Sequence, residues 1–222
     1  MRAALLDFDG TLVDLPVDWT RVRADVASLF RRQGVVDEFV PLNASIARAF
    51  DSLKAMGLTA ASRGHTKREV NRLLTEAEMA AASSANELPG ARHLLERLQN
   101  EEWATIVQTS NSVHCVGAVF DRLSFPTPTA IVGRETASRP KPNPMGVRRI
   151  LAEVGIRPVD SVVIGDGDFD VQLGRSIGAR TIGVLNPRVA RSSDWQSDKT
   201  VESLDGVMDI LADTRPLHEA IA

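Results

Sequence analysis

The sequence predicts an α/β fold in which a parallel sheet is interrupted by an all-helical insertion. After residue 89, short apolar runs alternate with helical stretches, which is typical of βαβ units. By contrast, residues 18–84 show helical spacing and few strand-like segments. A third observation is the apolar run over residues 3–6, which suits a strand buried on both faces of a parallel sheet. We therefore expect the chain to leave the sheet after its first strand and to return near residues 88–90.

Three runs of apolar residues recur at helical spacing within the insertion. The first starts near Val22 and ends at Gly34, and the second covers residues 42–57. A third run covers residues 70–81. The insertion is therefore expected to hold three or four helices.

After the insertion, helices and strands are expected to alternate. Helices are expected over residues 91–100, 113–123, 144–154, 169–177 and 204–211. Strands are expected over residues 103–107, 130–132, 161–164 and 181–184. A polar loop is expected over residues 194–199 and a loosely held tail over residues 214–222.

The composition is that of an ordinary globular protein. The chain has 222 residues, of which 43% are hydrophobic, enough for one large domain or one domain with an insertion. A net charge of −3 argues against nucleic acid as the main partner. The single cysteine, Cys115, excludes an intramolecular disulfide and fits a reducing compartment. The chain shows neither a signal peptide nor an apolar run near the ~20 residues that cross a bilayer, so we expect a cytoplasmic protein with no membrane partner.

Two acids, Asp7 and Asp9, follow the first predicted strand directly and precede Gly10 and Thr11. Ligands of open α/β sheets bind at the carboxyl ends of the strands. Two neighbouring acids repel each other, so they indicate a compensating positive charge, most simply a divalent metal. The alternative is an ordinary tight turn.

Two further strand ends carry polar groups. Residues 109–112 supply small donors before a helix, and such a helix start suits a phosphate, although an ordinary N-cap is the alternative. Lys141 lies between Pro140 and Pro142, which stiffen the loop around its ammonium. A rigidly held lysine suits a phosphoryl oxygen or a group of carboxylates. Here the alternative is a connector with a solvated lysine.

Three acids, Asp166, Asp168 and Asp170, follow the predicted strand over residues 161–164. Acids at the tip of a buried strand are costly unless a cation lies among them. The spacing excludes an EF-hand loop, and Asp170 stands where a dinucleotide fingerprint would need its third glycine. The alternative is helix capping by Asp168, which is compatible with a metal site.

In this order, the segments DFDGT, TSN, KPNP and GDGDFD resemble the haloacid dehalogenase-like (HAD) superfamily of phosphohydrolases. The resemblance covers residues 1–14 and 88–212. It implies a Rossmann-like core with helices on both faces of the sheet and a helical cap inserted after the first motif. The expected domains are thus a core over residues 1–14 and 88–222 and a cap over residues 15–87.

The resemblance also implies catalytic roles at the matching positions. Asp7 matches the nucleophile, which becomes a transient aspartyl-phosphate. Asp9 matches the acid that protonates the leaving alkoxide and later the base that activates water. Lys141 matches the lysine that neutralises the nucleophile and the phosphoryl oxygens.

Binding roles are implied in the same way. The expected phosphate-binding residues are Ser110, Asn111, Lys141, Thr11 and Gly10. Mg²⁺ is the implied cofactor, and its expected site residues are Asp7, Asp9, Asp166 and Asp170. Within this set, Asp170 is expected either to support the metal or to orient Lys141.

The acid at position 9 narrows the reaction, because dehalogenases and phosphonate-cleaving members of the superfamily generally lack it. P-type ATPases carry a lysine beside the nucleophile and need membrane spans. The expectation is therefore a Mg²⁺-dependent phosphomonoester hydrolase acting on a small phosphorylated metabolite. A sugar phosphomutase of β-phosphoglucomutase type is the main alternative, and a phosphate-binding pseudoenzyme is another.

Substrate choice is expected to lie in the cap, because the leaving group generally faces it in capped members. The candidate specificity residues are Trp19, Arg21, Arg23, Arg48, Lys54, Arg63, His65, Lys67 and Arg68. An arginine among them would pair with a substrate carboxylate, as phosphoglycolate requires. The alternative for each is a solvated helix face. The sequence leaves a monomer and a homodimer both open.

Overall fold

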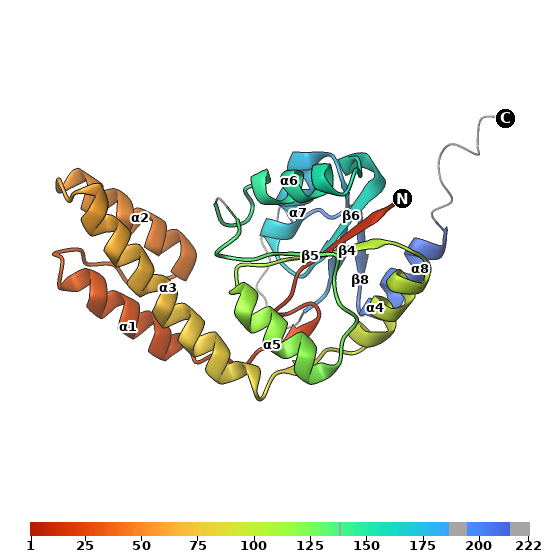
Figure 1. Cartoon of the computed structure of the whole chain (residues 1–222), viewed down its shortest axis with the longest axis horizontal. Helices are drawn as coiled ribbons and strands as arrows, with labels where there is room; N and C mark the ends of the chain where they lie inside the picture. Colours follow the sequence, from red (N-terminus) through yellow and green to blue (C-terminus); the bar gives the residue numbers. More distant parts are fainter. Residues whose placement is uncertain (138, 187–194, 214–222) are drawn as a thin grey trace. The chain divides into compact units, whose positions relative to one another are not determined.

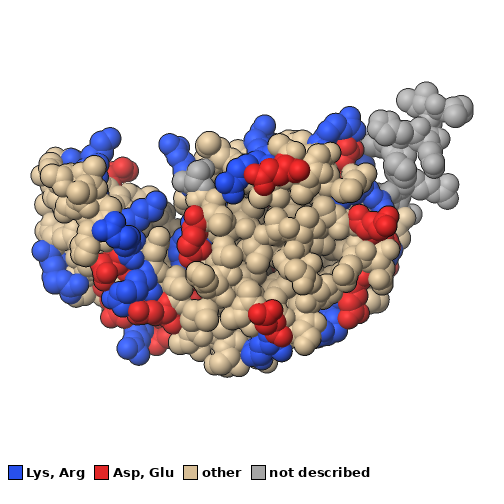
Figure 2. Space-filling view, viewed as in Figure 1, with Lys and Arg blue, Asp and Glu red and all other residues tan. Residues whose placement is uncertain are grey.

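The computed structural model describes residues 1–137, 139–186 and 195–213, and Figure 1 traces the chain. The chain divides into two compact units: Met1–Leu15 with Ser83–Ala222, and Pro16–Ala82. The expected tail over residues 214–222 lies outside the described residues. On the visible face, basic and acidic side chains are interspersed (Figure 2).

The first unit is built on a six-stranded sheet. In the order in which they lie side by side, its strands are β5 (Ala130–Val132), β4 (Ala104–Gln108), β1 (Ala3–Leu6), β6 (Ser161–Gly165), β7 (Arg180–Val184) and β8 (Lys199–Val201). Every neighbouring pair is parallel. β1 lies in the centre and all four of its residues are buried, which explains its unbroken apolar sequence.

Helices cover both faces of this sheet, as Figure 1 shows: α6 and α7 on one side, and α4, α5 and α8 on the other. Their bounds are α4 (Ala91–Asn100), α5 (Val113–Leu123), α6 (Met145–Glu153), α7 (Asp168–Ile177) and α8 (Leu204–Asp213). Between the sheet and α6 and α7, Leu5 and Val163 pack in one buried cluster with Leu151 and Leu173. The predicted Rossmann-like α/β fold is confirmed.

The second unit is all-helical, with α1 (Trp19–Arg31), α2 (Leu42–Ala55) and α3 (Ala60–Ala82). Its core includes Val26, Phe30 and Leu53. The side chain of Asp18 caps α1 by accepting the N–H of Arg21 at 2.9 Å. α3 begins ten residues before the apolar repeat that predicted it. The repeat does not mark this start, because the first turns of the helix are polar and mostly exposed.

Several boundaries differ from the sequence-based expectation. β4 extends to Gln108, because this polar residue still pairs with β5. Lys199 was expected in a polar loop but begins β8, so that expectation was wrong. A two-stranded antiparallel sheet of β2 (Val13–Asp14) and β3 (Asn86–Glu87) was not predicted, since two residues show no periodicity.

The register of the central strands decides where the motifs meet. Leu6 at the end of β1 is paired with Val107 of β4 and Ile164 of β6. All three strands run in the same direction, so the residues that follow them lie at one edge of the sheet. This carboxyl edge therefore gathers the side chains that follow β1, β4 and β6.

Candidate active site

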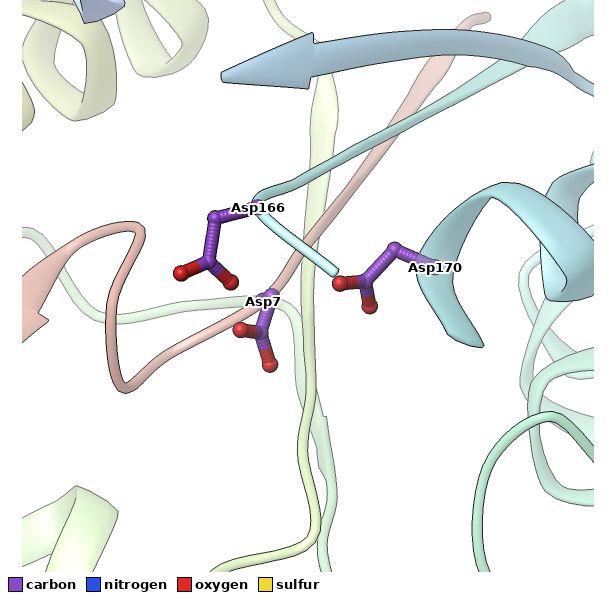
Figure 3. Close-up of side chains that lie close together, drawn as sticks. All are labelled: Asp7, Asp166 and Asp170. Atoms are coloured by element: carbon purple, nitrogen blue, oxygen red, sulfur yellow. The ribbon is translucent and has the colours of Figure 1, made fainter. Parts of the chain in front are cut away.

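Three buried carboxylates meet at the carboxyl edge of the sheet. Asp7 follows β1, Asp166 follows β6, and Asp170 lies in the first turn of α7. Each offers one oxygen, and these three oxygens lie within 4.8 Å of one another. Figure 3 shows the carboxylates of Asp7, Asp166 and Asp170 clustered at this edge. Residues from distant parts of the sequence thus form one acidic cluster.

One ammonium group contacts two of these acids. The Nζ of Lys141 donates to a carboxylate oxygen of Asp7 and, at 2.9 Å, to Oδ1 of Asp170. The Lys141 side chain is only 12% exposed. The structure therefore brings together four sequence-predicted site residues, Asp7, Lys141, Asp166 and Asp170.

Burial sets the protonation behaviour of this cluster. It raises the pKa of Asp7 well above the ordinary aspartate value, with Lys141 opposing the shift. Burial likewise raises the pKa of Asp166. For Lys141, burial acts to lower the pKa, but the charges of Asp170 and Asp7 outweigh it and raise the pKa on balance. Lys141 therefore carries its positive charge among three acids, and one ammonium cannot neutralise three carboxylates.

The rest of the first motif forms a tight turn beside the cluster. Asp9 is half-buried, and its Oδ1 accepts the N–H of Leu15 at 3.1 Å. Gly10 has φ +92°, and a Cβ there would lie 2.3 Å from Oδ2 of Asp166, so only glycine fits. Thr11 is buried, and its hydroxyl has no hydrogen-bond partner among the described residues.

The loop after β4 contains two of the predicted phosphate-binding residues, Ser110 and Asn111. Thr109 Oγ1 donates to Oδ1 of Asn111 at 2.8 Å, which braces the loop. Ser112 caps α5 by accepting the N–H of Cys115 at 3.0 Å, so the N-cap alternative holds for this residue. Ser110 is half-buried in the same loop. This loop follows β4, which is the neighbour of β1, the strand that Asp7 follows.

Sequence reasoning missed three residues that contact the site. The amide of Gln108 donates to Oδ1 of Asp170 at 2.7 Å. Asn186, which follows β7 after Leu185, donates to Oδ2 of Asp166 at 2.8 Å and to the Gly10 carbonyl at 3.2 Å. Arg134 donates to the Ser110 carbonyl at 3.1 Å. The signal available was position, since all three lie at or just after the ends of predicted strands.

The candidate specificity residues belong to the second unit. Arg48 pairs with Asp37 at 3.0 Å, and Arg63 donates to the carbonyl of Leu58, so both side chains have contacts within the second unit. Trp19 packs against the helical core. The exposed candidates are Arg21, Arg48, Lys54, His65, Lys67 and Arg68, whereas Arg23 is half-buried.

Comparisons with known proteins give one family. The family model for haloacid dehalogenase-like hydrolases matches residues 4–184. The chain is 29% identical to hexitol phosphatase A of Escherichia coli (strain K12), over 84% of each chain. It is 22% identical to a phosphoglycolate phosphatase of Xylella fastidiosa (strain Temecula1), over 90% of this chain and 89% of that one.

Solved structures show the same fold. The crystal structure of β-phosphoglucomutase from Clostridium difficile matches with a TM-score of 0.69 at 15% identity, over 96% of each chain. In the described part of the chain, no helix combines the length and apolar character needed to cross a membrane. The phosphatase names of the curated relatives agree with the sequence-based prediction of a HAD-like phosphatase. The chain belongs to the haloacid dehalogenase-like hydrolase family.

Proposed function

We propose that this chain is a Mg²⁺-dependent phosphatase that hydrolyses small phosphomonoesters through an aspartyl-phosphate at Asp7. The contact of the Lys141 ammonium with Asp7 and Asp170, beside Asp166, is the observation that carries this proposal. Such a site can hold a phosphoryl group against a carboxylate nucleophile, which is the main demand of phosphoryl transfer. Membership in the family supports the same reaction class.

The donor set fits Mg²⁺. Three buried carboxylates within 4.8 Å offer the hard oxygen ligands that this ion prefers. Burial raises the pKa of Asp7 and Asp166, so a cation would relieve an unfavourable concentration of negative charge. Asp7, Asp166 and the Asp9 carbonyl would hold the ion, with Asp170 in support. When bound, Mg²⁺ neutralises charge on the nucleophile and on the phosphoryl oxygens.

The chain's own groups account for the two half-reactions. The Asp7 carboxylate attacks phosphorus, the bond from phosphorus to the ester oxygen breaks, and Asp9 gives its proton to the leaving oxygen. Asp9 then takes a proton from the water that attacks the aspartyl-phosphate, which releases phosphate and restores Asp7. Lys141 offsets the repulsion between the carboxylate and the phosphate dianion.

The loop after β4 and the first-motif turn complete the phosphate site. We assign the Ser110 hydroxyl, Asn111 and the N–H groups at the start of α5 to the phosphoryl oxygens. Gly10 and Thr11 contribute from the turn after β1. Arg134 keeps this loop in place through its bond to the Ser110 carbonyl.

Substrate choice is assigned to the second unit, as the cap. The proposed specificity residues are Trp19, Arg21, Arg48, Lys54, Arg63 and His65. Hexitol phosphates and phosphoglycolate are the first substrates to test, because curated relatives are named for them. The single, buried Cys115 fits a reducing compartment, and we propose the cytosol and a monomer or homodimer.

The proposal is tested by phosphate release from p-nitrophenyl phosphate and from a panel of phosphorylated metabolites, with Mg²⁺ or EDTA. Wild type should hydrolyse them only with Mg²⁺, and Asp7→Asn should lose at least about 10⁴-fold in rate. Asp121→Asn, an exposed acid of α5, is the matched control. Interconversion of hexose phosphates with an added bisphosphate and little phosphate release would instead establish the mutase alternative. Activity that survives in Asp7→Asn would refute the nucleophile.

A further inference from the structure

Gln108 is a buried amide at the end of an otherwise nearly apolar strand. It is 1% exposed, and its Nε2 donates to Oδ1 of Asp170 at 2.7 Å. The orientation of the amide follows from chemistry, because an ionised carboxylate only accepts hydrogen bonds. Gln108 therefore contacts the site through Asp170.

Asp170 is fixed from three directions. Its Oδ1 accepts from Gln108 and, at 2.9 Å, from Lys141, while its Oδ2 accepts the N–H of Gly167 at 3.2 Å. Behind it, a Cβ at Gly165 would lie 2.3 Å from the Asp170 carboxyl carbon, so the carboxylate packs directly on the backbone. Without the amide, Oδ1 would keep only its contact with Lys141, so the carboxylate would be held less firmly.

Stability alone does not explain a glutamine at this position. Its Oε1 is buried and has no hydrogen-bond partner among the residues that the structure describes. A buried acceptor without a partner is destabilising relative to an apolar side chain of the same shape. The amide thus destabilises the fold at one end while it fixes Asp170 at the other.

We propose that Gln108 is a positioning residue: its amide holds Asp170 in the orientation that keeps Lys141 against Asp7. The inference rests on the proposed function for its effect on rate. Of the two roles expected for Asp170, the proposal favours the orientation of Lys141, because Oδ1 of Asp170 accepts hydrogen bonds from both Gln108 and Lys141. Asn186 occupies the corresponding place on the other side of the cluster, where it holds Asp166. Two neutral amides therefore orient two different acids.

The test is Gln108→Met, which keeps the length of the side chain and removes the donor. We expect kcat to fall about 10-fold, with KM and the Mg²⁺ concentration for half-maximal rate nearly unchanged. Thermal unfolding should occur at the wild-type temperature or above it, because the unpartnered Oε1 is gone. Thr105→Val, on the same strand, is the matched control and should keep the wild-type kcat.

A crystal structure of metal-free Gln108→Met supplies a readout that needs no activity. The orientation of the Asp170 carboxylate relative to Lys141 and Asp7 should change, whereas in Thr105→Val it should stay the same. Wild-type kcat in Gln108→Met, or a loss of rate that only follows a loss of stability, would overturn the assignment. If wild type hydrolyses no phosphomonoester, the proposed function fails, and the position of Asp170 in the variant still decides the role of Gln108.

Discussion

The two units use ion pairs of similar geometry in opposite surroundings. In the first unit, Lys141 lies 2.9 Å from Asp170, and the two side chains are 12% and 5% exposed. In the second unit, Arg72 lies 2.8 Å from Glu76, and the side chains are 51% and 60% exposed. Judged by distance alone, the two ion pairs would be equally strong. Burial distinguishes them, because the charges of the first pair have lost their water and those of the second have kept it.

Under the proposed function, this contrast separates charges that serve catalysis from charges that serve solubility. The exposed pairs resemble the interspersed surface charges seen in Figure 2. The buried cluster is unfavourable for folding by itself, since two of its acids have raised pKa values. Its arrangement makes sense for a site that binds a cation and a phosphate.

Among the variants that compare the two kinds of ion pair, the largest effect is expected from Lys141→Met. It removes the ammonium between Asp7 and Asp170, so kcat should fall by about 10²–10³-fold. The exposed counterpart, Arg72→Met, should leave kcat unchanged, as steady-state kinetics of both variants would show. A rate loss of less than about threefold in Lys141→Met would mean that burial of this charge has no catalytic purpose.

A smaller effect is expected from Asn186→Ala, which removes the donor to Asp166 and the Gly10 carbonyl. The Mg²⁺ concentration for half-maximal rate should rise by roughly 10–100-fold, because groups that orient metal ligands affect affinity by this amount. Saturating Mg²⁺ should restore most of the rate. Isothermal titration of Mg²⁺ into the protein checks the affinity directly. An unchanged Mg²⁺ affinity would show that Asn186 does not support the metal site.

The pH dependence of stability is the third expectation. Because burial raises the folded-state pKa of Asp7 and Asp166, the folded chain binds more protons than the unfolded chain between the ordinary and the raised pKa values. The free energy of unfolding of the metal-free protein should therefore fall as pH rises through that window. Asp7→Asn removes one of the two groups, so its slope should be shallower and its stability at neutral pH should be higher than that of wild type.

Urea unfolding in EDTA at several pH values between about 4 and 8 measures this slope. Asp51→Asn, at an exposed position of α2, should leave the wild-type slope unchanged. If the free energy of unfolding depends on pH equally in wild type and Asp7→Asn, burial does not raise the pKa of Asp7 as described.

The smallest effect is expected in the second unit. Arg72→Met breaks exposed pairs with Glu69 and Glu76 and should change the free energy of unfolding by less than about 0.5 kcal/mol. That difference should shrink further as salt screens the charges. A loss above about 2 kcal/mol would show that exposure is a poor guide to the value of an ion pair in this chain.

Charged residues at strand ends made much of the site predictable from sequence. Strands buried on both faces, such as β1, are plain apolar runs, so an acid directly after one stands out. Lys141 stands out because prolines flank it. Neutral amides give a weaker signal: Gln108 and Asn186 lie at or after strand ends, but their uncharged side chains do not stand out until the fold places each beside an acid.

Three elements of the fold were not predicted, or only in part, for a related reason. The start of α3 is polar and mostly exposed, so it carries no apolar repeat to mark it. β2 and β3 are two residues each, which is too short for alternation to appear. Periodicity detects only elements that bury a face and are long enough for the pattern to repeat.

Chemical trapping of the phosphoryl group tests the central claim most directly. Wild-type protein is mixed with substrate and Mg²⁺, quenched in acid within one turnover and reduced with borohydride, which converts an aspartyl-phosphate into homoserine. Peptide mass spectrometry should find homoserine at position 7, at a level that rises and falls with the first turnover. Released phosphate with unmodified Asp7 at every quench time would contradict the account.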